Sequence, residues 1–255
     1  MNNQIDLFEC QNDDIEDILK LFSKREIKAK NAFSIKKIDK TIAFEFIKKY
    51  HYLNDAKFFS IFCFGLFCRE KMVGCATFSN PQGIVALKGW FGFDNSNQSV
   101  LELSRLCVLP ELNKTNATSY LLGNSLKTLK KEGIKSVITL ADASRHVGSI
   151  YQVCNFKYYG LTEKKTDFFA EDGRINPRGS TKDVFGVWME RSRKHRYAIS
   201  LDGKTFPLYV EKKYPTQKDL FVVECCNESL IVEDLRHTRV YSCPRCCGKL
   251  ELLCQ

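Results

Sequence analysis

The strongest constraint on the fold is a series of short apolar runs in the first half of the chain. Three of them are FFSIFCFGLF, MVGCATFS and IVALKGWF, separated by the turn-forming clusters Arg69-Glu70-Lys71 and Asn80-Pro81-Gln82-Gly83. Runs of this length between breakers are typical of strands in an antiparallel meander. A fourth run, VLELSRLCVL, follows a polar loop and predicts a further strand.

Helical periodicity flanks this meander on both sides. Apolar residues recur at helical spacing over about 13–29 and over 39–50, and again from Leu121 to a lysine-rich end before Gly133. The strand SVITLAD comes next, then a short helix over 147–154 and strands near FKYYG and DVFGVWM. This order predicts a mixed α/β (α+β) fold with a mostly antiparallel central sheet.

Length and composition limit the architecture and the location. A chain of 255 residues with 44% hydrophobic content can bury one full core and carry a small appendage. We therefore expect one domain over 1–197 and a cysteine-rich tail over 198–255. The sequence offers neither a secretory signal nor an apolar stretch of membrane-spanning length, so we expect a cytoplasmic protein without a membrane partner.

Charge and cysteine usage narrow the classes further. The formal net charge of +9 favours an anionic partner, which can be nucleic acid, a phosphate-rich cofactor, or both. Six of the twelve cysteines lie singly in apolar segments, which is typical of reduced core residues rather than of a disulfide scaffold. These six are Cys10, Cys63, Cys68, Cys75, Cys107 and Cys154.

The tail carries a candidate zinc site. Cys243 and Cys246 have Cys-x-x-Cys spacing with a glycine shortly after, as in a zinc knuckle. The candidates for the remaining ligands are Cys225, Cys226, His237 and Cys254. Of these, we favour Cys225 and Cys226. A zinc there would have a structural role in a zinc-ribbon-like extension. The alternative is a metal-free tail with reduced cysteines.

Several motifs, in the right order, resemble known families. The segment from ELSRLCVLP to CNFKYYG resembles the cofactor-binding half of the GNAT acetyltransferase superfamily, within a likeness that spans roughly residues 40–190. More narrowly, KKYHYLN, ELSRLCVLP, LADASRHVGSIYQVCNFKYYG and RSRKHRY together resemble the phage Mom family, which modifies adenine in DNA to shield it from restriction. The resemblance implies a GNAT-like acyltransferase domain.

The same resemblance implies a site for acyl-CoA, with acetyl-CoA as the whole or at least a partial donor. Strand backbone groups would pair with the pantetheine arm, and the start of the following helix would receive the pyrophosphate. This assigns cofactor binding to Leu106, Cys107, Val108, Lys114, Asn116, Ser119 and Tyr120. The usual glycine-rich turn is replaced by the run from Asn113 to Ser119, so an ordinary capped helix is the alternative.

The Mom resemblance also implies an active site built from His51, Tyr52 and Asp142. Asp142 would act as a base or hold a metal or an amine, and its alternative role is to cap a helix near Ser144. Tyr151 would protonate the departing CoA thiolate, unless it is simply a packed aromatic. Iron dependence is associated with the family, and the three active-site residues offer nitrogen and oxygen ligands for iron.

A basic stretch with interleaved aromatics runs from Lys164 to Arg196. It is the candidate DNA contact, and the favoured cations are Arg191, Arg193, Lys194 and Arg196. A solvated charge run above packed aromatics is the alternative.

Three functions follow from these patterns. The first is a DNA adenine-modifying transferase of the Mom type, which adds an acetamido-type group to the exocyclic amine. The second is a conventional GNAT N-acetyltransferase that acts on a protein, an RNA or a small amine. The third is a noncatalytic nucleic-acid-binding protein that uses the fold as a scaffold.

Overall fold

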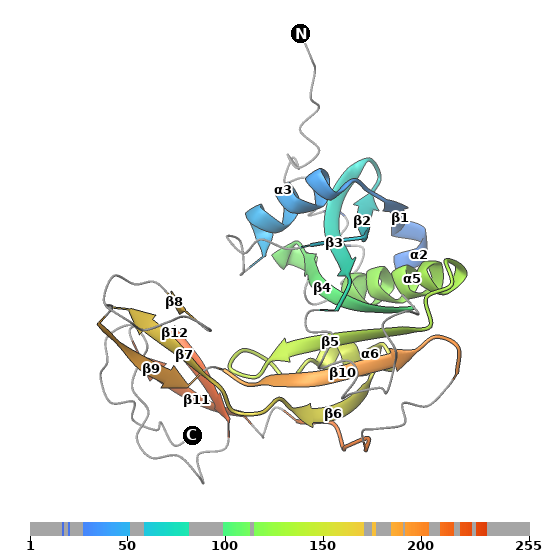
Figure 1. Cartoon of the computed structure of the whole chain (residues 1–255). Coiled ribbons are helices and arrows are strands. Elements are labelled where there is room, and N and C mark those ends of the chain that lie inside the picture. The colour runs from blue at the N-terminus through green and yellow to red at the C-terminus, as the bar shows by residue number, and fades with distance from the viewer. Residues whose placement is uncertain are drawn as a thin grey trace. The chain divides into compact units, whose positions relative to one another are not determined.

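Among the residues that the computed structural model describes, seven strands form the central sheet, and their order is β1-β2-β3-β4-β5-β10-β6 (Figure 1). The bounds are β1 Phe33–Lys37, β2 Phe62–Cys68, β3 Lys71–Ser79, β4 Val100–Val108, β5 Ser136–Asp142, β6 Lys157–Leu161 and β10 Lys194–Ser200. Neighbouring strands from β1 to β4 pair antiparallel, whereas β4 and β5 pair in parallel. The mixed α/β fold with a mostly antiparallel sheet is therefore confirmed.

The structure describes residues 17, 20, 28–51, 59–81, 99–112, 115–170, 175–176, 185–190, 192–203, 210–216, 220–225 and 228–233. Most of the expected helix over 13–29 and the expected strand IVALKGWF lie outside these residues. Within the described part of the chain, no helix is long and apolar enough to cross a membrane.

The chain folds as two compact units. Unit 1 consists of 1–139, 153–156 and 198–209, and unit 2 consists of 140–152, 157–197 and 210–255. The expected domain boundary at 197/198 falls inside β10 and stays a prediction.

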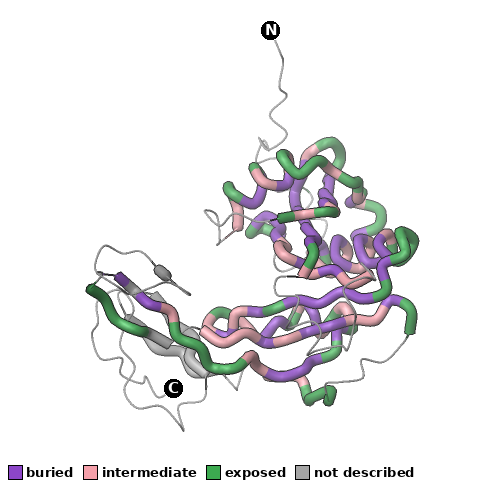
Figure 2. The backbone as a smooth tube through the Cα atoms, viewed as in Figure 1, coloured by how far each residue is buried: buried purple, intermediate pink, exposed green. Residues whose placement is uncertain are grey.

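Unit 1 buries the middle of its sheet, strands β2 and β3, on both faces. Every residue of β2 after Phe62 and of β3 after Lys71 is buried, so neither strand shows the in-and-out alternation of a half-exposed sheet (Figure 2). Helix α3 (Lys40–Tyr50) packs on β2, β3 and β4, and α5 (Ala117–Lys131) packs on β1 to β4. A short helix, α2 (Ala29–Ala32), contacts β1 and α5.

The helices bury the stripes that their sequences carry. Helix α3 buries Ala43, Phe46 and Ile47, which are spaced to share one face. Helix α5 buries its leucines at 121, 122, 126 and 129, and it ends before Gly133, which adopts φ +85°. Both helices match their predicted positions, because amphipathic periodicity is a local property of the sequence.

Unit 2 contains the end of β5, most of β10, all of β6, and helix α6 (Ser149–Val153) except its last residue. It also contains the three-stranded sheet β8-β7-β9 and the hairpin β11-β12. The bounds are β7 Thr166–Ala170, β8 Ile175–Asn176, β9 Gly186–Glu190, β11 Leu220–Cys225 and β12 Glu228–Glu233. The strand near DVFGVWM is β9, and the one near FKYYG is β6.

Candidate active site

Asp142 is the last residue of β5 and lies in unit 2. The chain turns immediately after it, since the amides of Arg145 and His146 both donate to the Asp142 carbonyl at 3.0 Å. The amide of Ala143 donates to the carbonyl of Arg193 at 3.1 Å, which ties this turn to the segment that leads into β10. The backbone on both sides of the carboxylate is therefore fixed.

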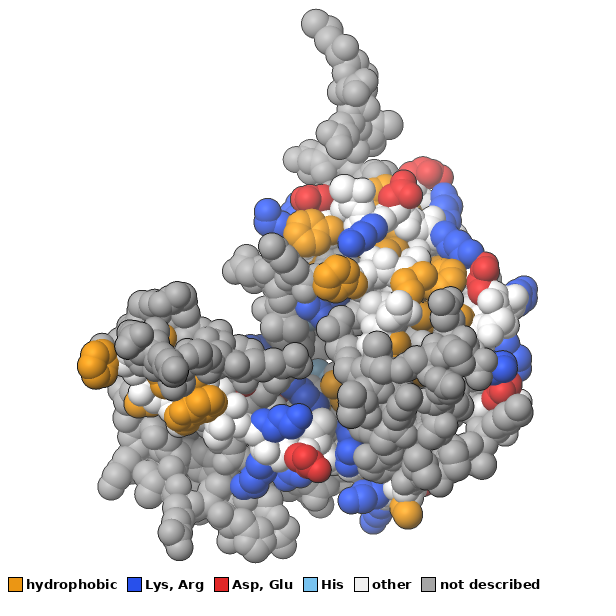
Figure 3. Space-filling view, viewed as in Figure 1, with side chains coloured by type: hydrophobic (Ala, Val, Ile, Leu, Met, Phe, Trp, Pro, Cys, Tyr) orange, Lys and Arg blue, Asp and Glu red, His pale blue; other side chains and the backbone are white. Residues whose placement is uncertain are grey.

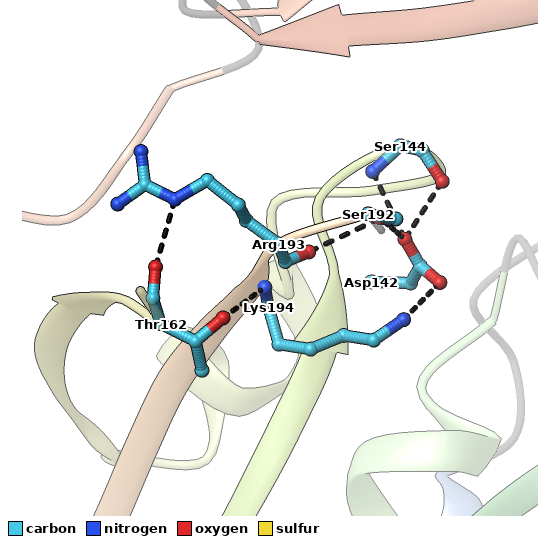
Figure 4. Close-up of polar contacts among 6 residues, drawn as sticks. All are labelled: Asp142, Ser144, Thr162, Ser192, Arg193 and Lys194. Atoms are coloured by element: carbon cyan, nitrogen blue, oxygen red, sulfur yellow. Dashed lines mark hydrogen bonds and ion pairs between the residues drawn. The ribbon is translucent and has the colours of Figure 1, made fainter. Parts of the chain in front are cut away.

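The carboxylate of Asp142 accepts four hydrogen bonds (Figure 4). Oδ1 accepts from the Ser144 amide at 3.1 Å and from the Ser144 hydroxyl at 2.7 Å. The Ser192 hydroxyl also donates to Oδ1, and the Lys194 ammonium donates to Oδ2. Each carboxylate oxygen offers about two lone-pair positions. Among the described residues, Oδ1 accepts three bonds and is fully used, whereas Oδ2 accepts one and retains one acceptor position.

These partners decide the charge of the group. Burial raises the pKa of Asp142, but the hydrogen bonds from Lys194, Ser192 and Ser144 and the charge of Lys194 outweigh burial and lower the pKa to about 2. A carboxylate with this pKa is ionised at neutral pH and holds a proton poorly. The geometry suits an acceptor or a ligand better than a general base, for which a pKa near the working pH is favourable.

Asp142 caps a turn in the structure, but not the start of a helix. Its carboxylate accepts the Ser144 amide, which is the pattern of a turn stabilised by an aspartate. The residues after it form a turn rather than a helix, and α6 begins only at Ser149.

His146 belongs to the same neighbourhood, and sequence reasoning missed it. Its Nδ1 accepts the Gly148 amide at 3.1 Å, so in the neutral ring Nε2 carries the hydrogen. Burial lowers its pKa most, the charge of Asp142 raises it, and the charges of Arg145 and Lys194 lower it. A histidine four residues beyond a strand-end aspartate is the sequence signal that would have found it.

Tyr151 lies on α6 and is 8% exposed. Its ring packs against that of Tyr197, with 5.4 Å between centroids, and the Tyr197 hydroxyl donates to the carbonyl of Val147. Gln152 donates to the Tyr197 hydroxyl at 3.1 Å. This burial agrees with the packed-aromatic alternative, and the role of Tyr151 as an acid stays a prediction.

Strand β4 changes its pairing along its length, within unit 1. It pairs with β5 only over Val100–Glu102, and the hydroxyl of Thr139 donates to the Leu103 carbonyl at 3.2 Å. Pairing with β3 continues to Val108, and the Leu109 amide donates to β3 at 3.0 Å. Because donors alternate along a strand, the amides of Leu106 and Val108 point away from β3. In the described pairing, they have no strand partner on that side.

The start of α5 provides a second group of backbone donors. Thr115 Oγ1 accepts the Ala117 amide at 3.2 Å, and the amide of Tyr120 donates to the Asn116 carbonyl at 2.9 Å. The Ser119 hydroxyl donates to the same carbonyl at 3.0 Å. Helix geometry leaves the amides before Tyr120 without an intrahelical acceptor. Leu106, Cys107, Val108, Asn116, Ser119 and Tyr120 stay predicted cofactor residues, and Lys114 lies outside the described residues.

The four cations that we expect to contact DNA have different surroundings in the structure. Arg191 lies outside the described residues, and Lys194 is bound to Asp142. The Nε atoms of Arg193 and Arg196 donate to the carbonyls of Thr162 at 2.7 Å and Gly160 at 3.4 Å. On the face drawn in Figure 3, the described Lys and Arg side chains are spread out, with Asp and Glu side chains among them.

Exposed aromatics accompany this basic segment on and beside β9. Phe185 is 81% exposed and Trp188 is 54% exposed. The Trp188 ring also contacts buried Phe168 edge-on, with 5.4 Å between centroids. The Trp188 ring is therefore held in place by Phe168 while about half of the residue stays exposed to solvent, as stacking with a base requires.

The remaining predicted residues are only partly described. His51 is half-buried at the end of α3, and its amide donates to the Ile47 carbonyl at 2.8 Å. Tyr52 lies outside the described residues, as do Cys226, His237, Cys243, Cys246 and Cys254, and of Cys225 only the backbone position at the end of β11 is described. No cluster of three or more metal-ligating side chains occurs in the described part of the chain, and the zinc and iron sites stay predictions.

Comparisons with solved structures find acetyltransferases. The ribosomal-protein-S18-alanine N-acetyltransferase from Escherichia coli is 14% identical with a TM-score of 0.43, over 70% of this chain and 99% of that chain. An N-acetyltransferase from Staphylococcus aureus Mu50 is 17% identical with a TM-score of 0.42, over 66% and 98%. The Bacillus subtilis acetyltransferase in complex with CoA is 14% identical with a TM-score of 0.37, over 66% and 97%.

No curated protein matches the chain. The profile of the Mom protein family, in contrast, matches residues 32–216, which include β1 to β9, β10 and the Asp142 site. Because this match covers well over half of the sequence, the chain belongs to the Mom protein family.

Proposed function

We propose that this protein is a DNA adenine-modifying transferase, which places an acetamido-type group on the exocyclic amine of adenine and uses acetyl-CoA as at least a partial donor of that group. The observation that carries the proposal is the Asp142 carboxylate, held ionised at the end of β5 by Lys194, Ser192 and Ser144. Membership in the Mom family supports the choice of DNA as the substrate.

The chemistry of the substrate matches the free position on Asp142. The exocyclic amine of adenine is an N–H donor and a weak nucleophile, and it is stacked inside the duplex until the base is flipped out. The open acceptor position on Asp142 Oδ2 can take one N–H of a flipped adenine and orient the nitrogen. A fixed acceptor orients the amine before the reaction, so less conformational freedom is lost on reaching the transition state.

Iron fits this carboxylate less well than an N–H donor does. A cation on the open position of Oδ2 would lie beside the ammonium of Lys194, which already occupies the other position. Like charges at this separation repel each other. We therefore assign no step to iron, and iron dependence stays a prediction from the family resemblance.

Acyl-CoA is proposed to bind to unit 1. The amides of Leu106 and Val108 point away from β3 and offer donors that can pair with the pantetheine arm. The N-terminal amides of α5 offer donors and a positive dipole end for the pyrophosphate.

DNA is proposed to contact unit 2 through its basic segment. Arg193 and Arg196 each use one nitrogen internally, and a guanidinium has further donors for phosphate. Trp188 and Phe185 supply exposed rings on which unpaired bases can stack.

Expression in a bacterial host tests the proposal. Host and plasmid DNA is digested to nucleosides and analysed by mass spectrometry, beside the variants His51→Ala and Asp142→Ala and the control Lys157→Gln. Lys157 forms an exposed ion pair with Glu211, and its loss should leave activity unchanged. A heavier adenine nucleoside in the wild type and the control, absent in the two variants, supports the proposal.

Two other outcomes would replace it. Unmodified DNA from a chain that binds CoA, with iron supplied, would favour a conventional N-acetyltransferase for a protein, an RNA or a small amine. A chain that binds nucleic acid but no CoA would instead favour a noncatalytic binding protein.

A further inference from the structure

The segment Ser192–Lys194 holds Asp142 through alternate residues. Ser192 and Lys194 both bond the carboxylate, while Arg193 between them directs its Nε to the Thr162 carbonyl (Figure 4). Alternation of this kind is expected where an extended chain enters a strand, because successive side chains point to opposite sides. One short segment therefore serves two separate contacts.

The backbone of this segment is fixed from two directions. The Lys194 amide donates to the Thr162 hydroxyl at 2.9 Å, and the Lys194 carbonyl accepts the Thr162 amide at 2.8 Å. The Arg193 carbonyl accepts the Ala143 amide at 3.1 Å. The side chains of Ser192 and Lys194 thus start from an anchored backbone, which limits how far the carboxylate can move.

Lys194 is also more enclosed than a typical surface cation. The side chains of the Lys194–Asp142 pair are 26% and 16% exposed, whereas those of the Lys157–Glu211 pair are 53% and 52% exposed. Enclosure weakens solvent screening, so the attraction within the Lys194 pair is stronger. A lysine that neutralises DNA phosphate needs an exposed head group, and this one is engaged with Asp142.

We propose that Lys194 and Ser192 are positioning residues for Asp142 rather than contacts to DNA. Ser192 helps to occupy Oδ1, and Lys194 occupies one position on Oδ2, so that a single acceptor position on Oδ2 faces the substrate amine. This inference rests on the proposed function, because it assigns the carboxylate to an N–H donor. The Ser-x-Lys pattern within RSRKHRY then belongs to the active site. Only the arginines of this segment remain as candidates for contacts to DNA phosphate.

The test compares Lys194→Gln, Lys194→Arg and Ser192→Ala with the control Lys157→Gln, which removes the same charge from an exposed pair. Adenine modification is measured against DNA concentration to separate kcat from KM, and affinity for unmodified duplex is measured by fluorescence anisotropy. We expect Lys194→Gln to lower kcat about 100-fold, the effect of a misplaced catalytic group, with DNA affinity within about twofold of the wild type. Lys194→Arg should recover much of kcat, and Ser192→Ala should lower it less.

Two results would overturn the inference. One is a Lys194→Gln variant with unchanged kcat and weakened DNA binding, which is the behaviour of a phosphate contact. The other is a thermal-unfolding cycle of Lys194→Gln and Asp142→Asn in which the shifts in Tm add independently, because paired residues must couple. The cycle needs no activity. If the wild type modifies no adenine, the proposed function fails, and the cycle still decides whether Lys194 holds Asp142.

Discussion

Gly148 occupies a position that a side chain would disrupt. Its φ is +75°, and an added Cβ would lie 2.7 Å from Tyr197 Cε2 and 2.9 Å from Tyr151 Cδ2. Gly148→Ala should lower the free energy of unfolding by at least about 2 kcal/mol, since backbone strain and overlap with the two rings add. Urea unfolding measures the loss.

Gly203 is the matched control for this substitution. It adopts φ +81°, but nothing in the described part of the chain lies within 4 Å of an added Cβ. Gly203→Ala should therefore show the backbone strain alone, about 1 kcal/mol. Equal losses in the two variants would mean that the packing of Tyr151 and Tyr197 against Gly148 contributes nothing.

His146 should make stability depend on pH. Burial lowers its pKa below the ordinary value of 6.5, an effect opposed by Asp142 and assisted by Arg145 and Lys194. Below about pH 6.5, His146 binds more protons in the unfolded chain than in the folded one, so the free energy of unfolding falls as pH falls. Above it, both states are neutral at this residue and the contribution is constant.

The variant His146→Gln isolates this contribution. Its amide oxygen can still accept the Gly148 amide, but it does not titrate. Between about pH 7 and about pH 5, the wild type should lose more free energy of unfolding than the variant. Parallel pH curves from urea unfolding would contradict a lowered pKa at His146.

At the scale of elements, the start of α5 allows cofactor binding to be separated from helix stability. Ser119→Glu puts a negative charge in the first turn, where it favours the helix dipole but repels a pyrophosphate. We expect CoA affinity to fall about tenfold, by roughly 1.4 kcal/mol, while Tm is unchanged or rises. Isothermal titration with CoA measures the affinity.

Lys127→Gln is the control on the same helix, because it lowers the net charge by the same amount at an exposed position outside the first turn. Equal losses of CoA affinity in both variants would indicate an effect of overall charge and would argue against a phosphate site at the start of α5.

At the scale of the whole molecule, the net charge of +9 predicts salt-dependent DNA binding. Each phosphate contact that is neutralised should contribute about 0.9 to the slope of log affinity against log salt. Lys164 and Lys165 lie exposed just before β7, and replacing either with Gln should reduce the steepness of this slope by about 0.9 if it meets a phosphate. Fluorescence anisotropy across a salt series measures it, and an unchanged slope would remove that lysine from the interface.

The elements that the sequence predicts well are those with local signals. Strands β2 to β5 and helices α3 and α5 follow from apolar runs, periodicity and breakers, all of which can be read within a few residues. Strand β10 was missed because KHRYAIS reads as part of a charge run. The structure buries His195, Tyr197 and Ala198 within it, and this burial depends on neighbouring strands that are far away in the sequence.

In the candidate site, too, local signals could be read from the sequence and long-range contacts could not. The sequence by itself determined the family resemblance, the position of Asp142 at a strand end and the amphipathic helix α5, because each is read from short stretches of residues. Only the tertiary structure decided that Lys194, 52 residues further along the chain, pairs with Asp142 rather than standing free for DNA. The physical reason is that a side chain's electrostatic partner is chosen by strand pairing between distant segments, and no local pattern of charges records that choice.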